Sequence, residues 1–315
     1  MHRLALRLFS PLLGTLLGLL LQGCAHAPRA TPPVPAHRFT FSDGGHALYF
    51  VLDRPAAAPA ARTVLPDTFV FVVAGSDCIG MARSLPQYFD GLQAESAPLR
   101  VFLLQKRFIG LQSSEPCGED FVRADHPAQW IRDQTEFMTA ELAAALANGQ
   151  RPRRVLVAGI SEGAEIAPVL ARRFAAVTHV ALLANGGMDP FIAYRLQMER
   201  HGWDYAVADV AARCTSPASD AEHAAGRTCR YWRELRALPH TANLLALQRP
   251  VFMAMGEADD MVPVESARFI RDAFAAGGKS NLELLTLPGA DHAFVRFGRS
   301  ELPSVWAAVS EWMQR

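Results

Sequence analysis

The sequence predicts an α/β fold in which helices cover both faces of a mostly parallel central sheet. Short apolar runs alternate with segments whose apolar residues recur at helical spacing, which is typical of parallel strands joined by helices. One run leads through Gly-Ile-Ser-Glu-Gly, residues 159–163, directly into a helical segment. Half of the 315 residues are apolar and 20% are charged, so the chain can bury a full hydrophobic core.

Residues 1–23 are predicted to be a signal peptide. Their apolar stretch, residues 12–21, is shorter and more interrupted than the roughly 20 apolar residues of a membrane-spanning helix. It ends in Leu-Gln-Gly-Cys, residues 21–24, which resembles a bacterial lipobox and implies that Cys24 is the lipid-modified first residue of the mature protein. An ordinary cleaved signal with a chance cysteine is the alternative. By the same resemblance, Ala25 favours a lipid anchor in the outer membrane, facing the periplasm.

Residues 24–36 hold four prolines and no apolar periodicity, so we expect an extended tether. The folded domain is expected to span residues 37–315. It begins with a hairpin, in which two apolar runs flank Ser-Asp-Gly-Gly at residues 42–45. Residues 68–73 and 100–104 are near-continuous apolar runs, as expected of strands buried on both faces.

Helices and strands continue to alternate in the middle of the chain. A helix is expected from Pro127 to the Asn-Gly pair at residues 148–149, because its apolar residues keep a 3.6-residue period. The strand before residue 160 and the helix after it come next. Pro168 inside that helix removes a backbone hydrogen bond and should kink it. Residues 179–183 form another buried strand.

The regular alternation of apolar strand-like runs with helical segments stops after Gly187 and resumes with a strand at residues 251–255. The last expected elements are a helix at residues 263–276, a strand at residues 282–287 and a helix at residues 304–313.

The motif at residues 159–163 resembles the nucleophile elbow of the α/β-hydrolase superfamily. A sharp turn from strand to helix strains the residue at its apex, and the positions two before and two after must be nearly bare, as Gly159 and Gly163 are. The turn lifts the Ser161 hydroxyl above the sheet edge and points helix N–H groups at developing negative charge. The resemblance covers nearly everything from residue 37 onward and implies the α/β-hydrolase fold.

An acid and a histidine follow the serine in the order of this superfamily. The sequence Gly-x-x-Asp-x-x-x-Pro at residues 256–263 resembles its acid loop and selects Asp259, while His292 follows the last strand. Ser161 would then attack a carbonyl carbon, His292 would transfer the proton, and Asp259 would orient the imidazole. Asp189 is the alternative acid. Taken singly, Asp259 could be a helix cap and His292 a surface-loop histidine.

The resemblance implies an oxyanion hole made of two backbone N–H donors, those of Glu162 and Ser76. Glu162 follows the nucleophile, and Ser76 lies in the loop after the strand at residues 68–73. This loop departs from the His-Gly-Gly-Gly form of many lipases and esterases, so Gly75 is the alternative donor. The Glu162 side chain is expected to be the variable position of the motif, although a carboxylate there could disfavour anionic substrates.

The superfamily often carries a cap insertion, here expected at residues 187–248. Six aromatic residues of this segment could wall an acyl or aryl pocket, or form the cap's own small core. They are Phe191, Tyr194, Trp203, Tyr205, Tyr231 and Trp232.

Besides Cys24, four cysteines in a chain that is predicted to be exported indicate two disulfide bonds. Cys78 and Cys117 both follow strands at the catalytic end, and Cys214 and Cys229 both lie in the cap, so we favour these two pairs. Buried free thiols are the alternative.

The sequence therefore predicts an esterase-like or dienelactone-hydrolase-like serine hydrolase, held in the cell envelope by its lipid. It would cleave small carboxylic esters or thioesters without a cofactor. The formal net charge is zero with no basic cluster, which argues against nucleic acid as a partner, and no His/Cys/Asp spacing suggests a metal site. A peptidase of the same fold and a non-catalytic binding lipoprotein are the alternatives. No feature predicts a protein partner.

Overall fold

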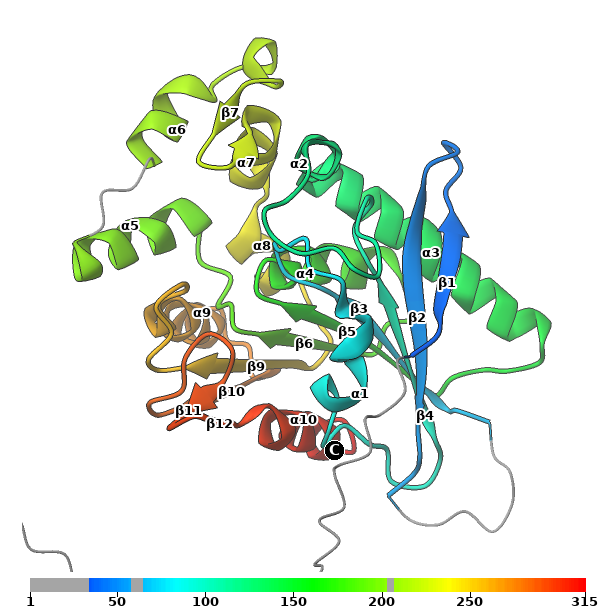
Figure 1. The fold of residues 1–315 in the computed structure, drawn as a ribbon. Helices are drawn as coiled ribbons and strands as arrows, with labels where there is room; N and C mark the ends of the chain where they lie inside the picture. Colours follow the sequence, from blue (N-terminus) through cyan, green and yellow to red (C-terminus); the bar gives the residue numbers. More distant parts are fainter. Residues whose placement is uncertain (1–33, 58–64, 203–206) are drawn as a thin grey trace, which may run out of the picture. The chain divides into compact units, whose positions relative to one another are not determined.

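Eight strands form one central sheet through the domain (Figure 1). The computed structural model describes residues 34–57, 65–202 and 207–315, which belong to one compact unit. The predicted signal peptide, Cys24 and most of the tether lie outside the described residues, as do Trp203 and Tyr205. Within the described ranges, no helix is both long and apolar enough to span a bilayer.

The sheet has the mostly parallel arrangement that the sequence predicts. Its strands are β1 (Ala36–Thr40), β2 (His46–Arg54), β3 (Thr68–Val73), β4 (Leu99–Leu104), β5 (Arg154–Ile160), β6 (His179–Leu183), β9 (Val251–Gly256) and β10 (Leu282–Leu287). They lie in the order β1-β2-β4-β3-β5-β6-β9-β10. The pairs β1–β2 and β2–β4 are antiparallel, and every other pair is parallel.

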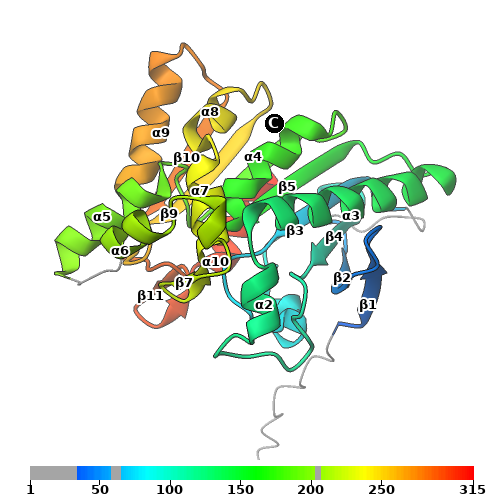
Figure 2. The ribbon, with the colours of Figure 1, turned by 90° about the horizontal axis from the view of Figure 1, so that it is seen from above.

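Helices connect these strands and pack on both sides of the sheet (Figures 1 and 2). They are α1 (Leu85–Tyr88), α2 (Glu119–Ala124), α3 (Pro127–Ala147), α4 (Gly163–Arg173), α5 (Pro190–His201), α6 (Val207–Arg213), α7 (Cys229–Ala237), α8 (His240–Leu245), α9 (Val264–Ala276) and α10 (Leu302–Trp312). Two short 3₁₀ turns (Met81–Arg83, Pro217–Ser219) and two small hairpins complete the chain. The hairpins are β7 (His223–Ala224) with β8 (Arg227–Thr228), and β11 (Val295–Arg296) with β12 (Arg299–Ser300).

Two apolar clusters cover the two faces of the sheet, because successive residues of a strand point to opposite faces. In β3, Phe71 belongs to the cluster that includes Phe137 of α3 and Leu170 of α4. Its neighbour Val72 belongs to the other cluster, with Trp306 of α10. The near-continuous apolar runs in the sequence are thus explained by burial on both sides.

The structure differs from the sequence prediction at some boundaries. β1 begins at Ala36, inside the predicted tether, and Val34 before it is buried in the cluster of α10. α9 begins at Val264, with Pro263 as its N-cap and not as its first helical residue. α4 continues past Pro168, which is buried within it. The short helices α1 and α2 were not predicted, since helices of four and six residues show no periodicity.

The segment at residues 187–248 is built of short elements, and its first part has a small core of its own. Phe191, Tyr231 and Trp232 pack there with Cys214, which follows α6, and Cys229 of α7, apart from both sheet clusters. α8 differs, because its Leu244 lies in the cluster of α3 and α4. We therefore use "cap" for α5 to α7 with the β7–β8 hairpin, and count α8 with the layers around the sheet. Figure 2 shows α5, α6 and α7 grouped together and α3 extending on the other side.

Six parallel strands, β4, β3, β5, β6, β9 and β10, bring their carboxyl ends to one edge of the sheet. Val73 of β3 is opposite Gly159, Ile160 is opposite Leu183, and Leu287 is opposite Gly256. The loops that follow these strands therefore converge, which is where open α/β sheets bind ligands. They carry the candidate site residues Ser76, Ser161, Asp189, Asp259 and His292.

Candidate active site

Ser161 stands at the apex of a tight turn between β5 and α4. Its φ is +53°, a left-handed value that costs a non-glycine residue free energy. Its own N–H donates to the carbonyl of Leu183 at 2.7 Å, which ties the apex to β6. A Cβ on Gly163 would collide with the carbonyls of Val73 and Ala74. The strained turn therefore needs a glycine at this position, as the motif predicts.

A continuous hydrogen-bonded chain links Ser161, His292 and Asp259. The Nε2 atom of His292 lies 3.0 Å from Ser161 Oγ, and its Nδ1 atom lies 2.8 Å from Asp259 Oδ2. The Asp259 side chain is fully buried, and its Oδ1 accepts hydrogen bonds from the N–H groups of Met261 and Val262, both at 2.8 Å. Because a carboxylate can only accept, Nδ1 carries the proton and Nε2 is free to accept from the serine hydroxyl.

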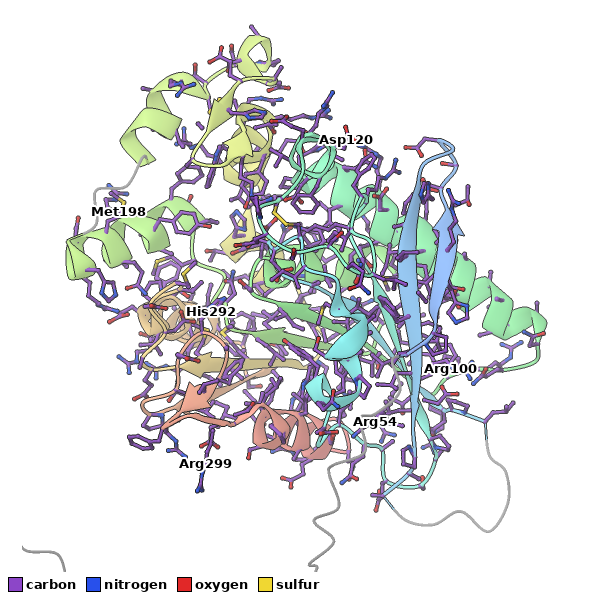
Figure 3. All side chains as sticks on the ribbon, in the orientation of Figure 1. Arg54, Arg100, Asp120, Met198, His292 and Arg299 are labelled. Carbon is purple, nitrogen blue, oxygen red and sulfur yellow. A yellow bond between two sulfur atoms is a disulfide. The ribbon has the colours of Figure 1, made fainter. Side chains whose placement is uncertain are left out.

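Glycine also allows the acid and histidine loops to approach each other. A Cβ on Gly256, at the end of β9, would collide with the carbonyls of Ala290 and Asp291. The loop that carries His292 therefore passes directly over the start of the acid loop. Figure 3 labels His292 in this region, beyond the carboxyl ends of β9 and β10.

Asp189, the alternative acid, has a different task. Its carboxylate accepts from the N–H groups of Phe191 at 2.8 Å and Ile192 at 3.3 Å, so it caps the N-terminus of α5. The structure brings Asp259, the acid that the sequence selects, and not the alternative Asp189, to Nδ1 of His292.

The two expected oxyanion donors flank the nucleophile. Ser76 and Glu162 line the same pocket as Ser161. A Cβ on Gly75 would lie 3.4 Å from the Ser161 Cβ, so the loop after β3 runs directly against the nucleophile. In the described part of the chain, neither the Ser76 N–H nor the Glu162 N–H donates to another protein atom. Both are available to a negatively charged oxygen.

The Glu162 side chain, which the sequence suggests is only the variable position of the motif, lies in a group of buried charges. It is buried, and its Oε1 lies 3.5 Å from Nζ of Lys106, which lies 2.8 Å from Asp125 Oδ1. The Lys106 ammonium also lies 3.9 Å from the ring centroid of Trp130. Burial raises the pKa of the Glu162 carboxyl, and the charge of Lys106 offsets this only in part.

A cap residue completes this group of charges. The Arg227 guanidinium, on β8, donates one hydrogen bond to Asp125 and another to the backbone carbonyl of Ser76. We name Lys106, Asp125, Glu162 and Arg227 the oxyanion-side cluster. The cluster involves both residues whose N–H groups form the candidate oxyanion hole. Glu162 is one of its members, and Arg227 donates to the backbone carbonyl of Ser76.

A second buried charge pair borders the same pocket. His240 of α8 donates from Nε2 to the carbonyl of Leu235 at 2.9 Å, and its Nδ1 is ion-paired with Glu165 of α4. Glu165 Oε1 also accepts from Asn185 Nδ2 at 2.7 Å. Burial lowers the pKa of His240, but the neighbouring Glu165 outweighs it, so the net shift is upward. The sequence analysis missed this pair and the oxyanion-side cluster.

The pocket between the sheet and the cap has a volume of about 190 Å³. Ser161 and Ser76 border it, together with Tyr194, Tyr231 and Trp232 of the cap. The sequence left two purposes open for the aromatic residues of the cap, and both are found, although Phe191 belongs to the cap's core and does not line the pocket. Tyr231 and Trp232 belong to the cap's own cluster and also wall the pocket.

Both favoured cysteine pairs are disulfide-bonded in the structure. Cys78–Cys117 joins the loop after β3 to the segment before α2, and Cys214–Cys229 joins the end of α6 to the start of α7. The first bridge limits the movement of the loop that carries Ser76. Among the described residues, no group of three or more His, Cys, Asp or Glu side chains could hold a metal ion.

Comparison with protein families gives one match. Residues 214–315 match the dienelactone hydrolase family, a stretch that includes Asp259 and His292 but not Ser161. No curated protein matches the sequence significantly.

Solved structures resemble the chain over most of its length. Est1E from Butyrivibrio proteoclasticus is 17% identical with a TM-score of 0.58, and the alignment covers 89% of this chain and 97% of Est1E. An esterase domain of a Rhodothermus marinus protein is 16% identical with a TM-score of 0.55, covering 90% of this chain and 98% of the domain. An acylaminoacyl peptidase from Pyrococcus horikoshii is 10% identical with a TM-score of 0.56, covering 90% of this chain but 42% of the peptidase. The chain has the α/β-hydrolase fold.

Proposed function

We propose that this protein is a serine hydrolase that cleaves small carboxylic esters or thioesters. The observation that carries the proposal is the chain of hydrogen bonds from Asp259 through His292 to Ser161, beside two unused N–H donors. The family match and the fold shared with esterases support a hydrolase of this class.

The mechanism follows from the geometry. His292 Nε2 takes the proton of Ser161 as Oγ attacks the carbonyl carbon, and the N–H groups of Ser76 and Glu162 stabilise the oxyanion. His292 then protonates the leaving alcohol or thiol, which leaves an acyl group on Ser161. Water, activated by the same histidine, releases the acid. Asp259 keeps the imidazole oriented and stabilises its positive charge in both halves of the reaction.

The pocket volume limits the size of the substrate group that it can enclose. At about 190 Å³ it is only slightly larger than an engineered cavity of about 150 Å³ that binds benzene. A short acyl chain or a single ring therefore fits, whereas a long fatty acyl chain would have to extend outside.

A peptidase of the same fold is the second candidate, supported by the likeness to the acylaminoacyl peptidase. Amide and ester substrates with the same acyl group separate the two, because an esterase turns over the ester and leaves the amide nearly untouched.

The experiment that tests the proposal is labelling with a fluorophosphonate probe, coupled to assays on esters of graded acyl length. Wild-type protein should be labelled on Ser161 and should hydrolyse the shorter esters. Ser161→Ala and His292→Ala should show almost no labelling and almost no ester hydrolysis. Their effects should not multiply in the double variant, since the residues act as a unit. A wild type that is neither labelled nor active would favour a binding protein that kept the fold. Full activity in Ser161→Ala would overturn the proposed mechanism.

We further propose that the protein is exported and anchored by a lipid on Cys24, in the outer membrane and facing the periplasm. The Leu-Gln-Gly-Cys motif at residues 21–24 supports the anchor, and two disulfide bonds are compatible with an oxidising compartment. Cells supplied with labelled palmitate should incorporate label into the wild type and not into Cys24→Ala. Equal labelling of the two proteins would exclude the lipid anchor.

A further inference from the structure

Three polar side chains from separate elements line the pocket near Ser161. They are Glu165 in the first turn of α4, Asn185 after β6 and Ser266 in the first turns of α9. All three are buried, with 5%, 7% and 1% of their surface exposed. The mechanism of ester cleavage uses none of them. We name these three residues the polar patch.

Ser266 has an unused hydroxyl. Its Oγ has no hydrogen-bond partner among the described residues, although the atom is completely buried. A Cβ on Gly186 would collide with this Oγ, so a bare glycine beside Asn185 makes the room that the hydroxyl occupies. A buried hydroxyl without a partner costs free energy, and one that lines a pocket can recover it from a bound ligand.

Asn185 is fixed in orientation and retains one donor. Its Oδ1 accepts from the N–H of Gly187 at 2.8 Å, and its Nδ2 donates to Glu165 Oε1 at 2.7 Å. An amide has two N–H hydrogens, so the second is not needed for the bond to Glu165. Asn185 and Ser266 together can offer one ligand group both a donor and an acceptor.

The charge of Glu165 is balanced by His240. Its Oε2 is ion-paired with His240, whose other ring nitrogen must donate, because its partner is the carbonyl of Leu235. The polar patch therefore offers hydrogen bonds without a net charge. A carboxylate or ammonium on the ligand would lose its hydration there and gain no opposite charge.

The rest of the lining restricts what can carry the polar group. Met188, Leu235 and Trp232 border the same space, whose volume of about 190 Å³ matches one ring or a short chain. The charged side chains of Arg227 and Glu162 border it too, but both are paired within the oxyanion-side cluster. We propose that the polar patch binds a neutral hydroxyl group on a small, otherwise apolar ester, such as a hydroxylated aromatic ester. This inference rests on the proposed function and names its substrate class.

The first test compares matched esters. The methyl esters of benzoic acid and of its 2-, 3- and 4-hydroxy derivatives place the hydroxyl in the acyl part, and benzyl and hydroxybenzyl acetates place it in the alcohol part. Wild type should prefer at least one hydroxylated ester over its parent by about tenfold in kcat/KM, and Ser266→Ala should lose that preference. Intrinsic reactivity cancels when the ratio is compared between the two proteins. Ser219→Ala, a buried cap serine bonded to the carbonyl of Ser216 and outside the pocket lining, is the matched control and should keep the wild-type ratio.

The second test does not depend on catalysis. Toluene and 4-methylphenol differ only by a hydroxyl, and their binding to Ser161→Ala is measured by calorimetry. The phenol should bind about tenfold more tightly, and Ser161→Ala/Ser266→Ala should lose the difference. Equal binding of the two ligands, or the same ester ratio in wild type and Ser266→Ala, would overturn the inference. If no ester is cleaved but the phenol is still preferred, the proposed function fails and the polar patch stands as a hydroxyl-binding site.

Discussion

The interior of the sheet and its boundary with the cap are held together by different forces. Both faces of the sheet are covered by apolar side chains, and the cap has its own separate apolar cluster. Where the cap and the adjoining α8 meet the sheet domain, buried or half-buried charge pairs join them. These pairs are Arg227–Asp125, Glu234–His126 and His240–Glu165.

This difference determines how the pocket wall is positioned. Apolar packing is not directional, so it gives free energy in proportion to area and tolerates small shifts. Charge pairs with hydrogen bonds fix distances and angles, but the loss of one partner leaves a buried charge and costs much more than the pair itself contributes. The sheet domain holds the candidate catalytic residues, and the charge pairs at the boundary fix the position of the pocket wall relative to them.

The largest expected effect is a difference in activity between two variants, one at an aspartate of the sheet domain and one at an aspartate of the cap. Asp259 lies in a loop of the sheet domain and contacts His292, whereas Asp189 begins the first cap helix. Asp259→Asn removes the orienting charge and should lower kcat by roughly 10⁴-fold, as the same change does in serine proteases. Asp189→Asn should stay within about tenfold of wild type, because asparagine caps a helix as well as aspartate does. Steady-state kinetics on one short ester measures both.

Thermal melts of both variants provide the control, since the comparison holds only when each protein is folded. If Asp189→Asn is the inactive variant and Asp259→Asn the active one, the acid is misassigned, and the cap would then contribute directly to the chemistry.

The next largest effect should fall on stability, at the oxyanion-side cluster. Lys106→Met keeps the length of the side chain over Trp130 but leaves Asp125 and Glu162 without the ammonium between them. Removing one partner of a buried ion pair typically costs about 3–5 kcal/mol of unfolding free energy. Urea unfolding at neutral pH measures this loss.

Arg233→Gln is the matched control for Lys106→Met. Its pair with Asp220 lies within the cap and is partly exposed, so its loss should cost less than about 1 kcal/mol. Equal losses of unfolding free energy in the two variants would show that the oxyanion-side cluster stabilises the protein no more than an ordinary surface pair does.

The candidate catalytic residues could be named from the sequence, whereas the charge pairs at the boundary could not, for a physical reason. Ser161 and Asp259 lie in motifs whose spacing is set by the local backbone, and Gly163 and Gly256 mark close approaches that exclude any side chain. His292 could be found because only one histidine follows the acid loop.

The charge pairs leave no such local signal. Asp125 and Arg227 are 102 residues apart. Asp125 directly follows the six-residue helix α2, and Arg227 lies in the two-residue strand β8. Neither element has a periodicity, and each side chain taken alone has the usual composition of a solvated surface. The one available hint was Lys106, one of only two lysines in a chain with many arginines, placed directly after a buried strand.

The smallest of the three effects concerns Glu234, and its size depends on pH. Glu234 Oε2 accepts from His126 Nδ1 and from the N–H of Ala128 at the start of α3, both at 2.8 Å, and Oε1 accepts from Arg230 at 2.9 Å. Burial alone would raise the pKa of Glu234, but the hydrogen bonds from His126, Arg230 and Ala128 outweigh it and lower the pKa to about 2.

A carboxyl whose pKa is lower in the folded than in the unfolded chain stabilises the fold above its ordinary value of 4.5. That contribution is lost as the pH falls from 4.5 through about 2, because the unfolded chain takes up the proton first. Such a pKa shift corresponds to a contribution of at most about 3 kcal/mol to the unfolding free energy at neutral pH. Glu234→Gln should therefore lower the unfolding free energy by about 2–3 kcal/mol at pH 7, and the gap to wild type should close towards pH 2. Urea unfolding of both proteins over this range measures the gap, in which the titrations of all other groups cancel. A gap that stays constant with pH would mean that Glu234 stabilises the boundary by its shape and not by its charge.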